Sequence, residues 1–139
     1  MPPLELLRIP ANLWQTMHDH VVACLPEEAC GLLAGRDGLV TLAIPVENAA
    51  HSPVRYRMEP RAQVGELLSI EARGLDLIGI YHSHPNGPAV PSATDLAEAY
   101  DPETLSLIWC SGRRGWSVRA FALRGGQPTE VTVEVLPAE

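Results

Sequence analysis

Two histidines that directly follow an apolar run constrain the fold and the chemistry of this chain more than any other feature. The run, residues 75–81, is short and carries β-branched and aromatic side chains, which favours a largely buried strand over a helix. Side chains alternate along a strand, so His82 and His84 are predicted to share one face, about 7 Å apart between Cα atoms. One cation can bind between two imidazoles at this spacing.

A hydroxyl and a carboxylate follow in the same stretch, at Ser92 and Asp95. Zinc binds imidazole nitrogen and carboxylate oxygen at about 2.0–2.2 Å, and a catalytic zinc site has three protein ligands and a fourth position for water. His82, His84 and Asp95 are therefore predicted to bind one zinc ion per chain. Two nitrogens and one carboxylate suit zinc better than other divalent ions.

The spacing Ser92-x-x-Asp95 is also that of a helix capping box, in which each side chain bonds to the backbone of the other residue. Alone, it favours the cap, and a lone His-x-His pair is weak evidence for a metal. The four residues together favour the metal site, and both interpretations can hold because a carboxylate is stabilised in the first turn of a helix. Ser83, between the histidines, is predicted to point to the opposite face and to be packed or hydrogen-bonded locally.

The rest of the chain predicts a single α/β domain over residues 1–139. Helices are predicted at residues 11–25 and 60–73 and, after Pro91, to about Tyr100. Strands are predicted at 75–81, 106–110, 116–123 and 129–135, with a hairpin around Asp37-Gly38 inside residues 30–45. This order predicts a mixed, mostly antiparallel sheet flanked by helices.

Composition and charge exclude several classes of protein. The chain has 10 Lys plus Arg and 17 Asp plus Glu, a net charge of −7, without a basic block, so nucleic acid is not expected as a partner. Three isolated cysteines fit reduced thiols in a cytoplasmic protein. No signal peptide is recognisable and no apolar run approaches the ~20 residues of a membrane span, so no membrane association is expected.

Amide hydrolysis is the reaction that these residues support. A zinc ion held by two imidazoles and a carboxylate lowers the pKa of bound water to about 7. Glu28, at the start of a predicted strand, is a candidate general base that could pass a proton to a leaving amine. Ser92 could donate to the oxyanion, a role whose loss costs about 2.7–4 kcal/mol in other enzymes.

The spacing His-x-His-Pro, then Pro-Ser-x-x-Asp, with an upstream Glu-x-Cys-Gly, resembles the JAMM (MPN+) metalloprotease family. The resemblance covers about residues 20–123. It places Glu28 rather than Glu27 at the glutamate of the family, which stands two residues before the cysteine. It implies the cytidine-deaminase-like α/β sandwich of MPN domains, and it implies that Asn48 orients the substrate backbone.

The resemblance also implies a substrate. Members of the family cut peptide or isopeptide bonds after ubiquitin-like proteins, and compact prokaryotic members cut after the Gly-Gly tail of sulfur carriers. The expected function is therefore a zinc-dependent peptidase or isopeptidase whose partner is a ubiquitin-like or sulfur-carrier protein, with its tail added as a strand. Residues 55–57 fit either a solvated loop or a contact with that tail.

Two other functions stay open. One is a non-catalytic MPN scaffold that binds proteins, although such relatives usually lack one or more of the five site residues. The other is a zinc amidase for small peptides or amino-acid conjugates. The oligomeric state also stays open, with a homodimer as one option.

Overall fold

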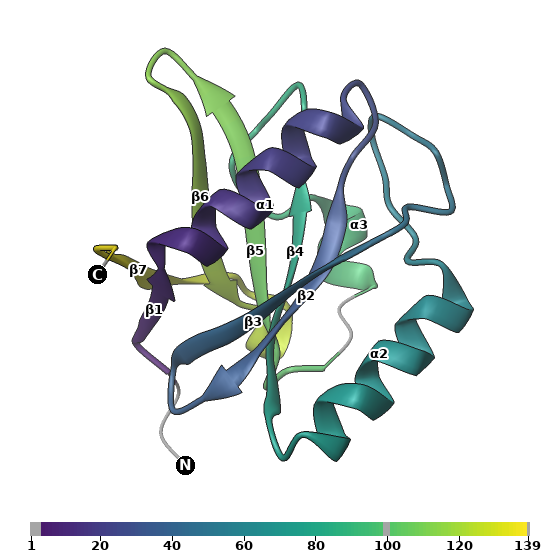
Figure 1. Cartoon of the computed structure of the whole chain (residues 1–139). Coiled ribbons are helices and arrows are strands. Elements are labelled where there is room, and N and C mark those ends of the chain that lie inside the picture. The colour runs from purple at the N-terminus through teal and green to yellow at the C-terminus, as the bar shows by residue number, and fades with distance from the viewer. Residues whose placement is uncertain (1–3, 99–100, 139) are drawn as a thin grey trace.

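Seven strands form a closed barrel in the part of the chain that the computed structural model describes, residues 4–98 and 101–138 (Figure 1). The strands are β1 (Leu6–Pro10), β2 (Cys30–Arg36), β3 (Leu39–Val46), β4 (Asp76–Ser83), β5 (Leu105–Gly112), β6 (Gly115–Ala122) and β7 (Thr129–Leu136). Their order around the barrel is β1-β3-β2-β4-β5-β6-β7. Four of the seven pairings are antiparallel, and β1–β3, β1–β7 and β4–β5 are parallel. The predicted mixed, mostly antiparallel sheet is confirmed.

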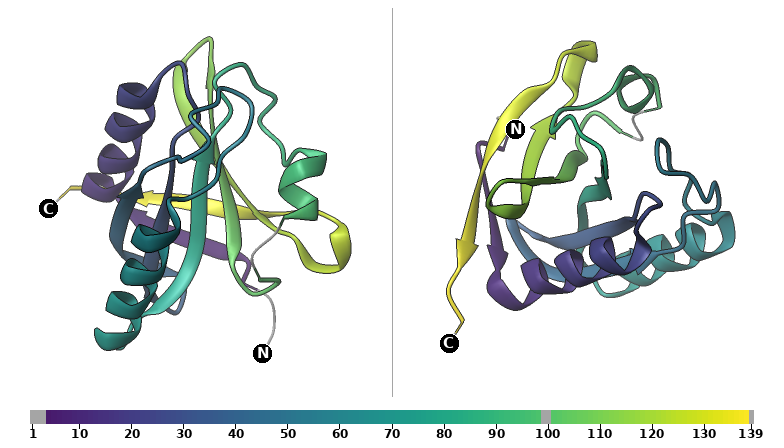
Figure 2. Two further views of the ribbon diagram at one scale, coloured as in Figure 1. Left: turned by 90° about the vertical axis from the view of Figure 1, so that its right-hand side faces the viewer. Right: turned by 90° about the horizontal axis from the view of Figure 1, so that it is seen from above.

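Three helices lie against the barrel: α1 (Ala11–Cys24), α2 (Pro60–Ala72) and the short α3 (Ala93–Ala97). Helix α1 packs on the side chains of Leu33 and Tyr81, whereas α2 packs with Leu32 and Ile80. Neighbours in a strand point to opposite faces, so α1 and α2 cover opposite faces of β2 and β4. Figure 2 shows α3 across the barrel from α1. None of the helices among the described residues is long and apolar enough to cross a membrane.

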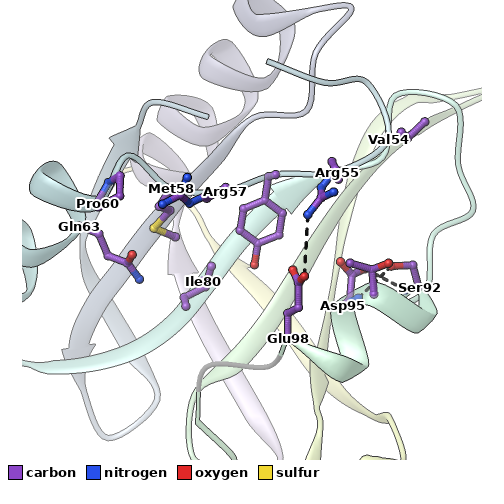
Figure 3. A pocket seen from close by; sticks show the side chains of 12 residues that line it. Val54, Arg55, Arg57, Met58, Pro60, Gln63, Ile80, Ser92, Asp95 and Glu98 are labelled. Atoms are coloured by element: carbon purple, nitrogen blue, oxygen red, sulfur yellow. Dashed lines mark hydrogen bonds and ion pairs between the residues drawn. The ribbon is translucent and has the colours of Figure 1, made fainter. Parts of the chain in front are cut away.

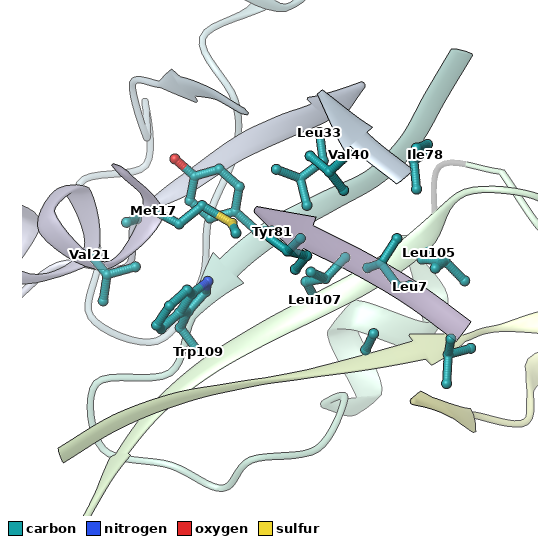
Figure 4. Close-up of a cluster of buried hydrophobic side chains, with 14 residues drawn as sticks. Leu7, Met17, Val21, Leu33, Val40, Ile78, Tyr81, Leu105, Leu107 and Trp109 are labelled. Atoms are coloured by element: carbon teal, nitrogen blue, oxygen red, sulfur yellow. The ribbon is translucent and has the colours of Figure 1, made fainter. Parts of the chain in front are cut away.

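The main core fills the concave side of the barrel (Figure 4). Every strand contributes at least one buried side chain to it, and Met17 and Val21 of α1 complete it. Trp109 and Tyr81 are the largest of its fully buried side chains. Each fully buried Leu, Ile or Val stabilises the fold by about 1.5–3 kcal/mol, so this cluster sets the position of β4 and of the residues at its end.

The hairpin between β2 and β3 turns at the predicted Asp37-Gly38 pair. Both residues have positive φ angles, 53° and 76°, as a two-residue turn between antiparallel strands requires. A Cβ atom on Gly38 would lie 2.9 Å from the carbonyl oxygen of Leu6. The turn is also where β1 joins the sheet, because the Arg8 N–H donates to the Gly38 carbonyl at 2.8 Å.

Two features differ from the prediction. Strand β1 was not predicted, because its partners β3 and β7 are distant in sequence and five residues beside prolines give no local signal. Its pairing closes the sheet into a barrel. Helix α3 ends at Ala97, before the predicted end at Tyr100, which lies outside the described residues.

Candidate active site

The two histidines meet at the carboxyl end of β4. His82 is in the strand, between Cys30 of β2 and Ile108 of β5, and the His84 N–H extends the pairing by donating to the Trp109 carbonyl at 2.8 Å. Both side chains are buried, and their Nε2 atoms are 3.1 Å apart. The predicted shared face therefore brings the two ring nitrogens close enough for one ion.

Asp95 approaches the same point from α3. Its Oδ2 atom lies 3.1 Å from Nε2 of both His82 and His84. The same oxygen accepts a hydrogen bond from the Ser92 N–H at 2.8 Å, and the Asp95 N–H donates to Ser92 Oγ at 3.0 Å. The capping box is thus present, and it aims the carboxylate at the histidines, so the cap does not conflict with the predicted metal site, which stays a prediction.

The spacing of these three atoms fits a zinc ion. In a tetrahedral site with bonds of about 2.0–2.1 Å, neighbouring ligand atoms are about 3.3 Å apart. The two Nε2 atoms and Asp95 Oδ2 form a triangle whose sides are all 3.1 Å. Glu28, His82 and His84 form a second group that could hold a metal, although their ligand atoms are only within 4.8 Å of one another. Asp95 is therefore the better placed third ligand.

The two histidines are held in different ways. Nδ1 of His84 lies 2.7 Å from the Pro88 carbonyl, which can only accept, so Nδ1 carries the hydrogen and Nε2 keeps a free lone pair. Nδ1 of His82 is buried and has no hydrogen-bond partner among the described residues. Instead, the His82 ring stacks on Tyr56, with centroids 4.7 Å apart and planes at 25°.

The surroundings shift the pKa values of the histidines in opposite directions. Burial lowers the pKa of His82. Burial also disfavours the charged form of His84, but hydrogen bonds to Asp95 and the Pro88 carbonyl outweigh it and raise the pKa of His84. A proton between His84 and Asp95 therefore competes with a metal ion for the same place.

The pKa values of the two carboxyl groups, Asp95 and Glu28, are shifted in opposite directions. Burial alone would raise the pKa of Asp95, but the hydrogen bonds to His82 and His84 outweigh it and hold the pKa well below its usual range. Glu28 is 3% exposed, and its Oε1 atom has no hydrogen-bond partner within residues 4–98 and 101–138. Burial raises the pKa of Glu28 to about 7, with His84 opposing and Asp95 assisting. Asp95 thus suits a metal ligand, and Glu28 suits a group that exchanges a proton near neutral pH.

Two buried side chains hold the segment that carries Glu28. Ser83 Oγ accepts from the Ala29 N–H at 2.8 Å and the Ser83 N–H donates to the Ala29 carbonyl, as the predicted local role of Ser83 requires. The Asn48 amide donates to the carbonyls of Glu28 and Arg55 at 3.0 and 3.1 Å. Because both its amide hydrogens bond to the protein, Asn48 has none left for a substrate, and its predicted role in orienting the substrate backbone is not supported.

Burial raises the pKa of the Cys30 thiol to about 12, so this cysteine stays protonated beside the site. A nucleophilic cysteine needs a lowered pKa and a histidine partner. Cys30 is therefore not suited to be a nucleophile, and it packs in the buried cluster beside α2.

A pocket of about 460 Å³ opens beside Ser92 and Asp95 (Figure 3). Its walls come from the segment before α2, from β4 and from α3, and they include Arg55, Tyr56, Met58, Ile80 and Glu98. Arg55 Nη2 and Glu98 Oε1 are 4.0 Å apart, and Figure 3 shows the two side chains reaching toward each other. Residues 55–57 line this pocket although Arg55 and Arg57 are exposed to solvent, and their contact with a substrate tail stays a prediction. Met58 lies in Arg57-Met-Glu-Pro60, which also resembles the family, whereas Glu98 gave no motif that could have identified it.

Comparisons with known proteins agree with this geometry. Residues 10–124 match the family model of prokaryotic homologs of the JAB domain. A probable TtuB-protein conjugate cleaving protease of Thermus thermophilus is 37% identical over 129 residues, which cover 92% of this chain and 83% of that protein. A CysO-cysteine peptidase of Mycobacterium tuberculosis is 33% identical over 134 residues, covering 94% and 92% of the two chains.

The fold has been seen before in a solved structure. A JAB1/MPN domain protein from Archaeoglobus fulgidus superposes with a TM-score of 0.60 at 20% identity, covering 92% of this chain and 97% of that one. The predicted MPN fold is confirmed, with its sheet closed into a barrel.

Proposed function

The chain belongs to the JAMM (MPN+) metalloprotease family as a compact prokaryotic member, and on that premise we propose that it hydrolyses the amide bond after the C-terminal Gly-Gly of a ubiquitin-like or sulfur-carrier protein. The named activities of its relatives show that the chain is a hydrolytic enzyme of this family. The observation that carries the proposal is the convergence of His82, His84 and Asp95 at 3.1 Å, with Glu28 close by and a pocket alongside.

His82, His84 and Asp95 hold the zinc ion in this proposal. When bound, zinc supplies Lewis-acid chemistry that makes water nucleophilic at neutral pH and polarises an amide carbonyl. Asp95 is the third ligand rather than Glu28 because its oxygen lies closer to the two Nε2 atoms and because its low pKa keeps it anionic. The Pro88 carbonyl keeps the hydrogen of His84 on Nδ1 and leaves Nε2 free to bind.

Glu28 acts as the general base. Its unpartnered Oε1 atom is free to take a proton from water and to pass that proton to the leaving nitrogen. A pKa of about 7 suits both transfers, because the carboxyl is then neither a strong acid nor a strong base at neutral pH. The bonds from Ser83 to Ala29 and from Asn48 to the Glu28 carbonyl keep this residue beside the ligands.

Ser92 stabilises the developing oxyanion. Its Oγ atom accepts the hydrogen bond from the Asp95 N–H, so its own hydroxyl hydrogen is free to donate. A donor at this position stabilises the charge that forms on the amide oxygen in the transition state.

The Gly-Gly tail binds in the pocket of about 460 Å³, whose wall includes both Ser92 and Asp95. A peptide tail bound in this pocket would place its C-terminal end beside the proposed zinc ligands. All five site residues come from one copy of the chain, so residues 1–139 are proposed to act as one domain. The homodimer and the cytoplasmic location stay predictions.

The two alternative functions are not equally well supported. A non-catalytic scaffold is disfavoured because all five site residues are present. An amidase for small conjugates is the second candidate, because a pocket of about 460 Å³ also has the volume of typical small-molecule sites.

Replacing Glu28 by Gln tests the proposal, with Glu27→Gln as the matched control because Glu27 is its more exposed neighbour. The substrates are a ubiquitin-like protein whose Gly-Gly is extended by cysteine, the same protein linked to a lysine side chain, and the free tripeptide Gly-Gly-Cys. Mass spectrometry should find a product ending in Gly-Gly with the wild type and Glu27→Gln. Glu28→Gln should keep about one zinc per chain and cleave at least about 100-fold more slowly.

Unchanged cleavage by Glu28→Gln would exclude Glu28 as the base. Equal cleavage of the tripeptide and the protein would favour the small-conjugate amidase. Absence of zinc from wild-type protein purified without chelators would remove the basis of the proposal.

A further inference from the structure

His82 lacks the hydrogen bond that normally orients a metal-binding imidazole. Metal ligands of this type almost always donate their second ring N–H to an oxygen atom, and that bond fixes the ring. His84 has such a bond to the Pro88 carbonyl, at 2.7 Å. Nδ1 of His82 is buried without a partner in the described part of the chain. Another contact must therefore hold its ring plane.

Tyr56 makes that contact. Its ring is stacked on the His82 imidazole, with centroids 4.7 Å apart and planes at 25°. Stacked aromatic pairs are worth more than the area they bury and restrict rotation of both rings. Burial first, and then the neighbouring Asp95 charge, raise the pKa of Tyr56 far above its ordinary value, so the phenol stays neutral and is not itself a ligand or base.

The segment that carries Tyr56 is fixed in turn. The Asn48 side chain donates to the Arg55 carbonyl at 3.1 Å and accepts from the Arg57 N–H at 3.0 Å, so it binds the residues on both sides of Tyr56. It also donates to the Glu28 carbonyl. One buried amide therefore sets the position of the stacked ring and of the proposed base together.

We propose that Tyr56 is a positioning residue for His82, whose ring plane it holds by stacking in place of the missing hydrogen bond. The inference rests on the proposed function only in that His82 binds zinc. It predicts that zinc affinity depends on an aromatic face at position 56 and not on the hydroxyl.

The test compares Tyr56→Leu, which removes the aromatic face, with Tyr56→Phe, which keeps it. Zinc affinity is measured by competition with a chromophoric chelator, and the geometry of the site by the visible absorption of the cobalt(II)-substituted protein. Tyr56→Leu should bind zinc about tenfold more weakly and change the cobalt spectrum. Tyr56→Phe should restore both. Arg55→Gln, which alters the same pocket but does not stack on His82, should leave both unchanged.

Equal zinc affinity and cobalt spectra for the wild type, Tyr56→Phe and Tyr56→Leu would overturn the inference, whether or not the wild type cleaves its substrate. A wild type that binds no zinc would overturn both this inference and the proposed function. If Tyr56→Leu does not fold, Tyr56→Met replaces it, because methionine fills a similar space without an aromatic face. In the metal-free wild type and Tyr56→Phe, the His82 ring protons should show the upfield NMR shift of a stacked ring, and its absence would also overturn the inference.

Discussion

The two faces of β4 each carry a histidine–tyrosine pair, and the two pairs are built differently. Tyr81 points toward α1, where its hydroxyl lies 2.7 Å from His20 Nδ1 and the rings meet edge to face at 84°. Its neighbour His82 points to the opposite face, where it stacks on Tyr56 at 25° and its Nδ1 has no partner in the described structure. The same two residue types thus form a hydrogen-bonded pair on one face and a stacked pair on the other.

The difference separates a structural pair from a site. A buried polar atom without a partner costs about 1–3 kcal/mol, so the hydrogen bond on the α1 face is what stability favours. On the other face, His82 Nδ1 and Glu28 Oε1 are both buried without a hydrogen-bond partner in the described part of the chain. The face of β4 that carries His82 is therefore less stable than a face on which every buried polar atom is paired. Its imidazoles and the Glu28 carboxylate remain free to take part in a reaction.

The largest expected effect comes from removing the histidine of each pair in turn. His82→Ala should lose the bound zinc and all measurable cleavage, because two ligands do not make a catalytic site. His20→Ala should keep about one zinc per chain and cleave normally, although it unfolds at a lower temperature. Elemental analysis and cleavage of a Gly-Gly-extended substrate check both variants. Full zinc content in His82→Ala would show that His82 is not a zinc ligand and that the two histidines do not differ in role.

The next effect concerns the stability of the metal-free protein, which the buried Glu28 should lower at neutral and alkaline pH. The folded pKa is about 7 against a model value of 4.5, so between these values the folded state binds more protons than the unfolded state. The free energy of unfolding therefore falls as the pH rises through this window. Glu28→Gln removes the charge, and should stabilise the metal-free protein above pH 7 by on the order of 3 kcal/mol.

Urea unfolding of the wild type and Glu28→Gln in chelator, at about one pH unit on either side of the window, measures this gain. The gain should vanish in acid, where Glu28 is protonated in both states. Glu27→Gln is the control and should give no comparable gain. A gain that is the same at all pH values would mean that the charge of Glu28 is not its source.

The comparison also explains what could be predicted from the sequence. His82, His84, Ser92 and Asp95 lie in one short stretch, so strand alternation and a helix start are enough to predict that they meet. Glu28 comes from a distant segment: its place at the start of a predicted strand made it only a candidate, and the resemblance to a family distinguished it from Glu27. Their chemical roles stay predictions.

Tyr56, by contrast, could not be predicted as a neighbour of His82. It lies in a segment without regular structure, and the Asn48 side chain that fixes this segment gives no periodic signal. Strand β1 was missed for a related reason, because its pairing with β7 joins the two ends of the chain. Contacts between distant segments decide both features, and local patterns do not encode them.

A smaller effect is expected from removing the tyrosine hydroxyl on each face. Tyr81→Phe deletes the hydrogen bond to His20 and should lower the free energy of unfolding by about 1–2 kcal/mol while zinc and cleavage stay unchanged. Tyr56→Phe should keep the stability within about 0.5 kcal/mol, because the stacked pair does not use the hydroxyl. Denaturant unfolding of the two variants compares the faces directly. Equal losses would mean that the two pairs are held in the same way.

The smallest effect on stability is expected at the rim of the pocket, where Arg55 and Glu98 are both about 60% exposed and 4.0 Å apart. An exposed pair at this distance contributes about 0–1 kcal/mol, since water screens the charges and two long side chains lose freedom. Glu98→Gln should therefore leave unfolding and zinc content within error of the wild type. Because both side chains line the pocket, the variant should change KM more than kcat. A change in kcat alone would instead place Glu98 in contact with the reacting groups, and would extend the site on this face of β4 as far as the end of α3.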